Sequence, residues 1–276
     1  MRIVTLTSET KQNLLENLLK RSTNDYGEYE KTVADIIEQV KNRKEDAIFE
    51  YSLKFDKCNL SKENFEVTKA EIEEAYTQLD AHFIDVMKAS AANIRAYHEK
   101  QKRNSWFDAK EDGTILGQKI TPMHSVGVYV PGGKAAYPST TLMNVVPAKV
   151  AGVPNIIMTT PAGADGKVNA ATLVAADIAG VDRIFKVGGA QAIAALAYGT
   201  EMIPKVDKIV GPGNIFVALA KRAVYGHVSI DSIAGPSEIL VLADETATPR
   251  YVAADLLSQA EHDEMASAIL ITTSSE

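Results

Sequence analysis

Short β-type segments alternate with segments of helix length, most of them Ala-rich, between residues 126 and 225. This alternation constrains the fold more than any other feature of the chain. The strand candidates are residues 126–130, 156–159, 183–187 and 208–210, and the helix candidates are residues 140–150, 169–178, 190–197 and 214–225. Such a pattern is typical of βαβ units, in which helices join parallel strands and cover the sheet. It predicts an α/β fold with a parallel sheet.

The region before this alternation has a mainly helical pattern. Residues 1–5 predict a short strand, and residues 8–102 predict a series of helices. Apolar side chains recur there at the three- and four-residue spacing of a buried helix face. The first such series is Val33, Ile36, Ile37 and Val40. Residues 114–120 then have the pattern of a further β-type segment.

A Gly-Pro step at residues 235–236 ends the alternation. Beyond it, residues 239–242 predict a buried strand, residues 249–265 a helix and residues 268–272 another strand. A strand that follows a helix normally leads into a further element of the same sheet, yet the sequence stops at Glu276. We therefore expect the chain to be a truncated piece of a larger protein.

The composition excludes several classes of protein. The chain has 276 residues and a formal net charge of −7, and so acidic a chain is a poor ligand for nucleic acid or an anionic membrane. It has neither an uninterrupted apolar run long enough for a membrane span nor the apolar core of a signal peptide. Its one cysteine, Cys58, excludes an internal disulfide and fits a reducing cytoplasm, where we expect it to have a structural role.

Three Gly-rich loops each follow a predicted strand and precede a predicted helix, at residues 131–133, 188–191 and 211–214. In an open parallel sheet such loops line the edge where ligands bind. Glycine lets the backbone approach a ligand, and a helix N-terminus offers free N–H groups to a phosphate. Gln191 and Asn214 stand where their side chains reach such a ligand. The pattern indicates either a cofactor cleft or, more simply, three tight β-to-α turns.

The predicted helix at residues 249–265 carries three polar side chains on one face. At about 100° per residue, Asp255, Gln259 and His262 fall within roughly a 60° sector that borders apolar positions. Polar side chains beside apolar packing need partners. The face is therefore either a hydrogen-bonded domain contact or part of a metal site with Gln259 and His262 as ligands.

Five motifs together resemble the histidinol dehydrogenase family in order and spacing. They are residues 126–133 (Val-Gly-Val-Tyr-Val-Pro-Gly-Gly), 187–192 (Val-Gly-Gly-Ala-Gln-Ala), 209–214 (Ile-Val-Gly-Pro-Gly-Asn), 231–238 (Asp-Ser-Ile-Ala-Gly-Pro-Ser-Glu) and 258–262 (Ser-Gln-Ala-Glu-His). The resemblance covers essentially the whole chain. It implies an aldehyde-dehydrogenase-like α/β fold with two Rossmann-like parallel-sheet domains and a helical N-terminal region. It also implies an intertwined homodimer in the cytoplasm.

The same resemblance implies a zinc- and NAD-dependent enzyme that oxidises L-histidinol to L-histidine through an aldehyde, the last step of histidine biosynthesis. Carried over by motif, Tyr129, Gln191 and Asn214 would contact NAD. The substrate would lie against three further residues, of which the last two would also bind zinc: Ser237, Gln259 and His262. The alternatives are an enzyme that oxidises another small alcohol, such as a sulfonated diol, and a non-catalytic nucleotide-binding fragment.

The family's Glu-His pair for acid–base catalysis and two further zinc ligands have no counterpart in this chain, and the resemblance implies that they lie beyond Glu276. We therefore expect residues 1–276 alone to be inactive and to bind zinc poorly, because stable zinc sites use three or four protein ligands. The resemblance also implies that residues 1–128 form a helical region and the first part of domain 1, that residues 129–237 form an inserted domain 2, and that residues 238–276 begin the returning half of domain 1.

Overall fold

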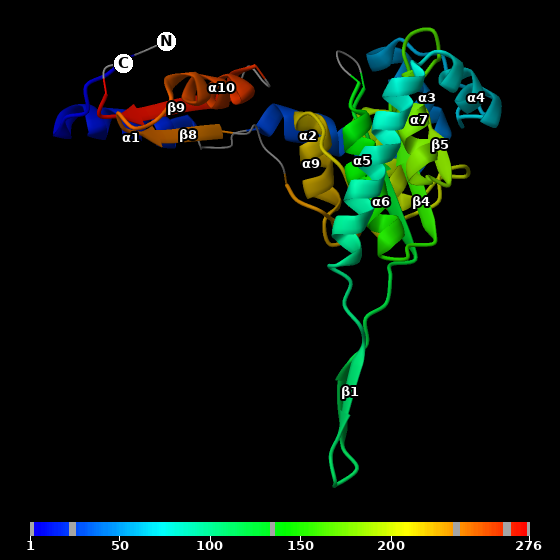
Figure 1. Ribbon diagram of the computed structural model, residues 1–276. Coiled ribbons are helices and arrows are strands. Elements are labelled where there is room, and N and C mark those ends of the chain that lie inside the picture. Colours follow the sequence, from blue (N-terminus) through cyan, green and yellow to red (C-terminus); the bar gives the residue numbers. More distant parts are fainter. Residues whose placement is uncertain (1–2, 22–25, 133–135, 234–237, 262–265, 275–276) are drawn as a thin grey trace.

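A five-stranded parallel sheet lies at the centre of the computed structural model, which describes residues 3–21, 26–132, 136–233, 238–261 and 266–274 (Figure 1). In spatial order the strands are β5 (Arg183–Phe185), β4 (Asn155–Thr159), β3 (Ser125–Tyr129), β6 (Lys208–Val210) and β7 (Ser229–Ile230). All neighbouring strands pair in parallel. The order in space therefore reverses between β3 and β6, and this reversal is the point at which open α/β sheets bind ligands.

Helices cover both faces of this sheet. On one face α6 (Pro138–Val150) and α7 (Ala170–Ala179) pack with α4 (Lys69–Thr77) and α5 (Ala81–Glu99). On the other face α8 (Gly189–Tyr198) and α9 (Ile215–Val224) pack with α2 (Gly27–Arg43) and α3 (Glu45–Tyr51), which continues into the π-helix η1 (Ser52–Asp56). Connections that run in opposite directions from β3 place their helices on opposite faces, because each βαβ crossover is right-handed.

The core confirms the sequence pattern. Every residue of α8 from Ala190 to Ala197 is buried, because small side chains let this helix pack closely between the sheet and the helices outside it. The apolar series predicted for α2 is buried as well: Val33, Ile36, Ile37 and Val40. The predicted α/β architecture with a parallel sheet and a helical N-terminal region is thus the observed one.

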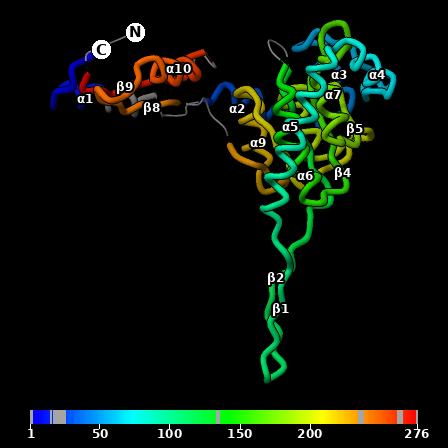
Figure 2. The backbone as a smooth tube through the Cα atoms, viewed as in Figure 1, coloured from blue at the N-terminus to red at the C-terminus, as the bar shows by residue number. Residues whose placement is uncertain are grey.

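A two-stranded antiparallel arm interrupts the chain between α5 and β3. It consists of β1 (Trp106–Ala109) and β2 (Ile115–Gln118), and it extends far from the sheet and helices (Figure 2). All eight strand residues are exposed, including the large apolar side chains Trp106, Phe107, Ile115 and Leu116. The sequence predicted β2 within residues 114–120, whereas β1 was not predicted.

A smaller lobe contains both ends of the chain (Figure 1). It consists of α1 (Ser8–Arg21), β8 (Glu238–Ala243), α10 (Pro249–Ala260) and β9 (Ser267–Thr272). The strands β8 and β9 pair in parallel, and α10 packs against both. Over the described residues, no helix has the length and apolar character needed to cross a membrane.

Three predictions about the elements are wrong. The strand predicted to be buried at residues 239–242 alternates between exposed and half-buried residues, with Leu240 59% and Leu242 77% exposed. Residues 3–5 form no strand, because a strand needs a hydrogen-bonded neighbour and none of the described strands pairs with them. The helix predicted for residues 249–265 ends at Ala260, where the N–H of Glu261 closes the last turn on the carbonyl of Leu257. The division into domains at residues 128 and 237 stays a prediction.

Gly211 lets the chain after β6 pass close beside the end of β3. Its φ of +113° lies in a region that favours glycine, and a Cβ at this position would lie 2.1 Å from the carbonyl oxygen of Tyr129. No real side chain tolerates so short a contact with backbone. The loop after β6 can therefore leave the sheet beside β3 only because residue 211 has no side chain.

We predict that Gly211→Ala destabilises the protein by more than a comparable substitution in open space. Gly226 is the matched control, because its φ is +94° and a Cβ there meets nothing within 4 Å. Gly226→Ala should cost about 1–2 kcal/mol through backbone conformation alone, and Gly211→Ala should cost a further 1–3 kcal/mol or so through overlap. Urea unfolding of the three proteins measures both values, and equal losses would contradict the role of the Tyr129 contact.

Candidate active site

The Gly-rich loops lie at one edge of the five-stranded sheet. Residues 131–132 follow β3, Gly188 follows β5 and residues 211–214 follow β6. Because these strands are parallel, their carboxyl ends meet at the same edge. The structure thereby brings together the three loops that the sequence indicated, while residue 133 of the first loop lies outside the described residues.

Tyr129 connects two of these loops. Its hydroxyl accepts a hydrogen bond of 3.1 Å from the N–H of Gly189, the first residue of α8. Gln191 lies two residues further into this helix and is 1% exposed, and its Oε1 is 2.7 Å from where a Cβ of Gly189 would stand. Its side chain makes no hydrogen bond to another described residue. A buried amide without a partner, at the edge where ligands bind, suits contact with a polar ligand.

A buried ion pair holds the loop after β6. The ammonium of Lys221, on α9, donates to the carbonyl of Gly211 at 2.9 Å and pairs with Asp231, which follows β7. The carboxylate of Asp231 accepts the N–H of Gly211 at 2.8 Å, so both polar atoms of this glycine are fixed. The Lys221 side chain is only 3% exposed, so removal of Asp231 would leave its ammonium without a charged partner in a poorly solvated place. No local pattern in the sequence indicates this pair.

Asn214 is the N-cap of α9. Its Oδ1 accepts hydrogen bonds from the N–H groups of Phe216 and Val217, at 3.1 and 3.2 Å. Asn214 therefore stabilises this turn through its side-chain oxygen, as the simpler interpretation of the sequence predicts. Its amide nitrogen donates no hydrogen bond to a described residue, and the residue is exposed at the edge of the sheet. The Asn214 side chain can therefore cap α9 with its oxygen and contact a ligand with its nitrogen.

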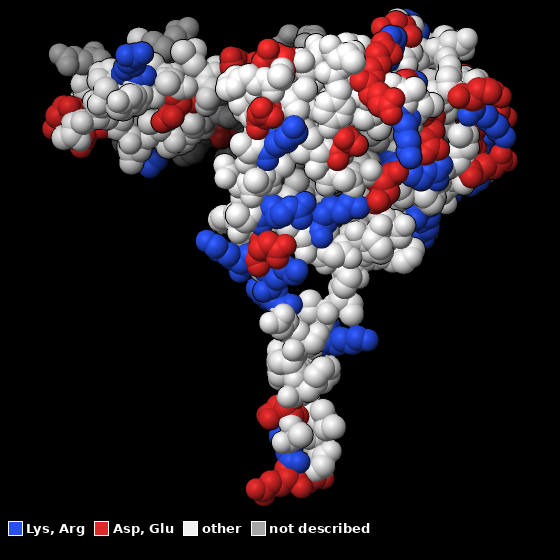
Figure 3. All heavy atoms as spheres, turned by 45° about the vertical axis from the view of Figure 1, so that its right-hand side comes forward, with Lys and Arg blue, Asp and Glu red and all other residues white. Residues whose placement is uncertain are grey.

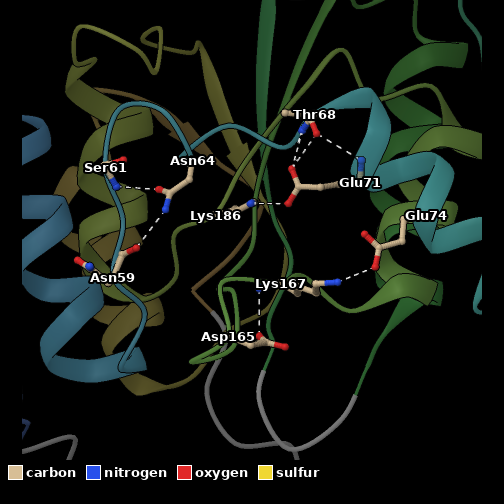
Figure 4. A network of polar contacts seen from close by, with 9 residues as sticks. All are labelled: Asn59, Ser61, Asn64, Thr68, Glu71, Glu74, Asp165, Lys167 and Lys186. Carbon is tan, nitrogen blue, oxygen red and sulfur yellow. Dashed lines mark hydrogen bonds and ion pairs between the residues drawn. The ribbon is translucent and has the colours of Figure 1, made fainter.

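A second buried ion pair fixes the loop after β5. Lys186 and Glu71 point toward each other from the end of β5 and the first turn of α4 (Figure 4), and the Nζ–Oε1 distance is 2.5 Å. Glu71 also accepts the N–H of Thr68 in a capping box. Burial alone would raise the pKa of Glu71, but the hydrogen bonds from Lys186 and Thr68 hold this pKa below its usual value. The carboxylate therefore stays charged and anchors the chain before Gly188.

A cavity of about 470 Å³ opens between the loops after β3 and β4. Its described lining includes Phe55 and Asp56 from η1, residues 131–132, residues 160–163, and Asn169 at the start of α7. This volume lies within the range of roughly 300–1,000 Å³ typical of ligand pockets. The sequence analysis did not identify the cavity. The available signal was Asp56, a charged residue directly after an apolar helical series.

Cys58 lies near this cavity but is not a nucleophile candidate. It is buried and unpaired, and burial raises the pKa of its thiol. Since the thiolate is the reactive form, a raised pKa disfavours attack by this sulfur. The structural role predicted for Cys58 is consistent with its environment.

Of the predicted zinc and substrate residues, Ser237 and His262 lie outside the described residues. Gln259 is described, on α10; it is half-buried, and its Oε1 is shielded from solvent without a hydrogen-bond partner in the described part of the chain. Within that part, no three His, Cys, Asp or Glu residues gather as a metal site would require. At the predicted metal position the described part of the chain therefore has one oxygen without a hydrogen-bond partner, that of Gln259. The predictions for Ser237 and His262 are not tested.

The known proteins that this chain resembles in sequence are histidinol dehydrogenases. The family model described as histidinol dehydrogenase matches residues 19–276. A histidinol dehydrogenase of Clostridium acetobutylicum is 56% identical over 265 residues, which are 96% of this chain and 61% of the relative. That of Geobacillus kaustophilus is 60% identical over 247 residues, or 90% of this chain and 58% of the relative. The chain thus spans about 60% of the length of these relatives.

A solved structure has the same fold. The crystal structure of histidinol dehydrogenase from Elizabethkingia anophelis superposes with a TM-score of 0.82 at 42% sequence identity. The match covers 88% of this chain and 56% of that one. The loops and helices around the sheet edge therefore belong to a fold already seen in a protein of that description.

We predict that Tyr129→Phe lowers stability at neutral pH and removes one pH dependence at high pH. Loss of the acceptor leaves the Gly189 N–H without its partner and should cost about 1–2 kcal/mol. Burial raises the pKa of Tyr129 to about 12. The folded wild type therefore holds this proton more tightly than the unfolded chain, whose value is about 10. Its stability advantage is complete below pH 10 and is lost as the pH rises toward 12.

The measurement is denaturant unfolding of both proteins at pH 8 and at steps above pH 10. The wild-type advantage of about 1–2 kcal/mol should shift by about 2–3 kcal/mol in favour of Tyr129→Phe over that range, so that the variant becomes the more stable protein at the highest pH. Tyr97→Phe is the control, because Tyr97 is 64% exposed and the change should alter stability by less than about 0.5 kcal/mol. A gap that stays constant with pH would contradict the assignment.

Proposed function

Because the chain belongs to the histidinol dehydrogenase family, we propose that the protein oxidises L-histidinol to L-histidine with NAD, as a step of histidine biosynthesis. The observation that supports this most directly is the family match over residues 19–276, together with three Gly-rich loops that converge at one sheet edge. The relatives are named histidinol dehydrogenase, and the chain covers about 60% of their length. The activity of the whole protein is accordingly a proposal.

The residues at the sheet edge fit NAD. We propose that Tyr129, Gln191 and Asn214 contact the cofactor. Among the described residues, the buried amide of Gln191 has no hydrogen-bond partner, and the amide nitrogen of Asn214, beside the N-terminus of α9, donates to none. Helix N-termini favour the phosphates of a dinucleotide through their free N–H groups and dipole. When bound, NAD accepts the hydride that leaves the substrate carbon.

We propose that zinc is the second cofactor and that Gln259 and His262 are two of its ligands, with Ser237 against the substrate. The shielded, unpaired Oε1 of Gln259 supports an oxygen ligand at this position. Zinc would supply a template for the amino and imidazole groups of the substrate. The described residues contain no complete ligand set, so further ligands have to come from other residues.

We also propose that the protein is a homodimer in the cytoplasm. The arm formed by β1 and β2 supports an assembly, since its stem is largely uncharged between the body and a charged tip (Figure 3). Its exposed apolar side chains, Trp106, Phe107, Ile115 and Leu116, are the kind of surface that proteins usually cover with a partner. A small-molecule substrate follows from the family, and the net charge of −7 disfavours nucleic acid.

The full-length protein should reduce two molecules of NAD for each molecule of L-histidinol, because an alcohol becomes an acid through an aldehyde. Absorbance of NADH measures the rate, and amino-acid analysis identifies the product. A zinc chelator should abolish the activity, and added zinc should restore it. If the protein did not oxidise L-histidinol but oxidised another small alcohol, such as a sulfonated diol, the proposed substrate would be wrong. The proposed class of reaction would still stand.

Substitutions at Asn214 separate cofactor contact from helix capping. Asn214→Ser keeps an oxygen for the N-cap and loses the amide nitrogen, whereas Asn214→Ala loses both. We expect both variants to raise the KM for NAD by about tenfold through loss of a hydrogen bond. Only the Ala variant should also lose about 1 kcal/mol of stability. A wild-type KM in the Ser variant would show that Asn214 acts as a cap alone.

A further inference from the structure

The cavity between the loops after β3 and β4 contains an unpaired carboxylate. Asp56 is the one acidic side chain among the described residues that line it, and Lys167, the one basic residue there, is paired with Glu74 at 2.6 Å. It is partly buried and makes no hydrogen bond or ion pair with another described residue. Burial raises the pKa of this carboxyl, as expected for an acid that lacks a protein partner. A shielded acceptor that faces 470 Å³ of open space is suited to a ligand that donates hydrogen bonds.

The π-helix η1 puts Asp56 in this place. Segments of this kind are rare and frequently occur at functional sites. In η1 the ring of Phe55, which also lines the cavity, stacks on Tyr51 with an interplanar angle of 5°. The cavity therefore combines the ring of Phe55, one face of which Tyr51 covers, with a carboxylate at the next position. An aromatic face suits a base, and a carboxylate suits neighbouring hydroxyl groups.

The position in the sheet indicates which half of a dinucleotide this cavity would take. In Rossmann-like domains the first strand carries the pyrophosphate loop, and an acidic residue nearby accepts a hydrogen bond from the 2′-hydroxyl of the adenosine ribose. Here β3 is the first strand of the sheet and β4 the second, and the cavity lies between the loops that follow them. The end of β4 and the residues after it are Thr159, Thr160 and Pro161, which carry no carboxylate.

We propose that Asp56 selects NAD over NADP by accepting hydrogen bonds from the adenosine ribose of the cofactor, with Phe55 beside the adenine. This inference rests on the proposed NAD-dependent function and names its specificity-determining residue. A ribose with a free 2′-hydroxyl donates to the carboxylate. A 2′-phosphate offers no comparable donor and brings two negative charges toward a third one. The carboxylate thus comes from the helical region before the sheet and replaces the one that Rossmann-like domains commonly carry after the second strand.

The experiment compares Asp56→Asn, which keeps the shape and removes the charge, with wild type in the full-length protein. In the dehydrogenase assay the ratio of kcat/KM for NAD to that for NADP should fall by about tenfold or more. Most of the change should appear in KM, since Asp56 acts on the end of the cofactor remote from hydride transfer. Asp165→Asn is the matched control, because it removes the same charge from the loop after β4 but does not line the cavity.

A binding measurement separates this inference from the proposed function. Calorimetry with adenosine 5′-monophosphate and adenosine 2′,5′-bisphosphate needs no substrate and no nicotinamide. Wild type and Asp165→Asn should prefer the monophosphate by about tenfold, and Asp56→Asn should lose this preference. If histidinol is not oxidised but the preference depends on Asp56, the proposed function fails and this inference stands. An unchanged preference in Asp56→Asn, or no binding of either nucleotide to wild type, overturns it.

Discussion

The close approach of Gly211 to β3 is the constraint on which the site depends, because a Cβ there would lie 2.1 Å from the carbonyl oxygen of Tyr129. The neighbouring strands β3 and β6 send their helices to opposite faces, so the loops at their carboxyl ends diverge. Gly211 permits this path of the chain, and Lys221 and Asp231 hold it by bonding both polar atoms of that glycine. A loop fixed in this way needs little reordering when a ligand arrives, which lowers the entropic cost of binding.

The opposite side of the sheet is fixed by a similar device. The segment before α4 runs antiparallel along β5, where the N–H of Lys186 donates to the carbonyl of Phe65. Arg183 binds both carboxylate oxygens of Glu66, and Lys186 pairs with Glu71. An edge strand that would otherwise expose unpaired groups is thereby covered. The helical N-terminal region thus completes the sheet and also brings Asp56 to its edge.

The sequence predicted what depends on local pattern. The alternation of segments predicted the parallel sheet, and the apolar spacing predicted the buried face of α2. The Gly-rich turns indicated the sheet edge at which the loops before Gln191 and Asn214 lie. It did not predict contacts that depend on the folded register. The cavity at Asp56 requires a π-helix, and the pair of Lys221 and Asp231 joins elements that only the sheet brings together. Residues 3–5 have an apolar pattern but no described strand beside them, so propensity alone was misleading there.

The π-helix η1 has a consequence for how the chain tolerates changes in length. A π-helix holds one more residue per hydrogen-bonded ring than an α-helix. Deletion of a single residue from positions 52–54 would let the ordinary helix of α3 continue, and each residue of an α-helix turns by about 100°. Asp56 and Phe55 would then face another direction, although every side chain of the cavity was still encoded. Insertions and deletions in this short segment should therefore disturb the cavity more than most substitutions there.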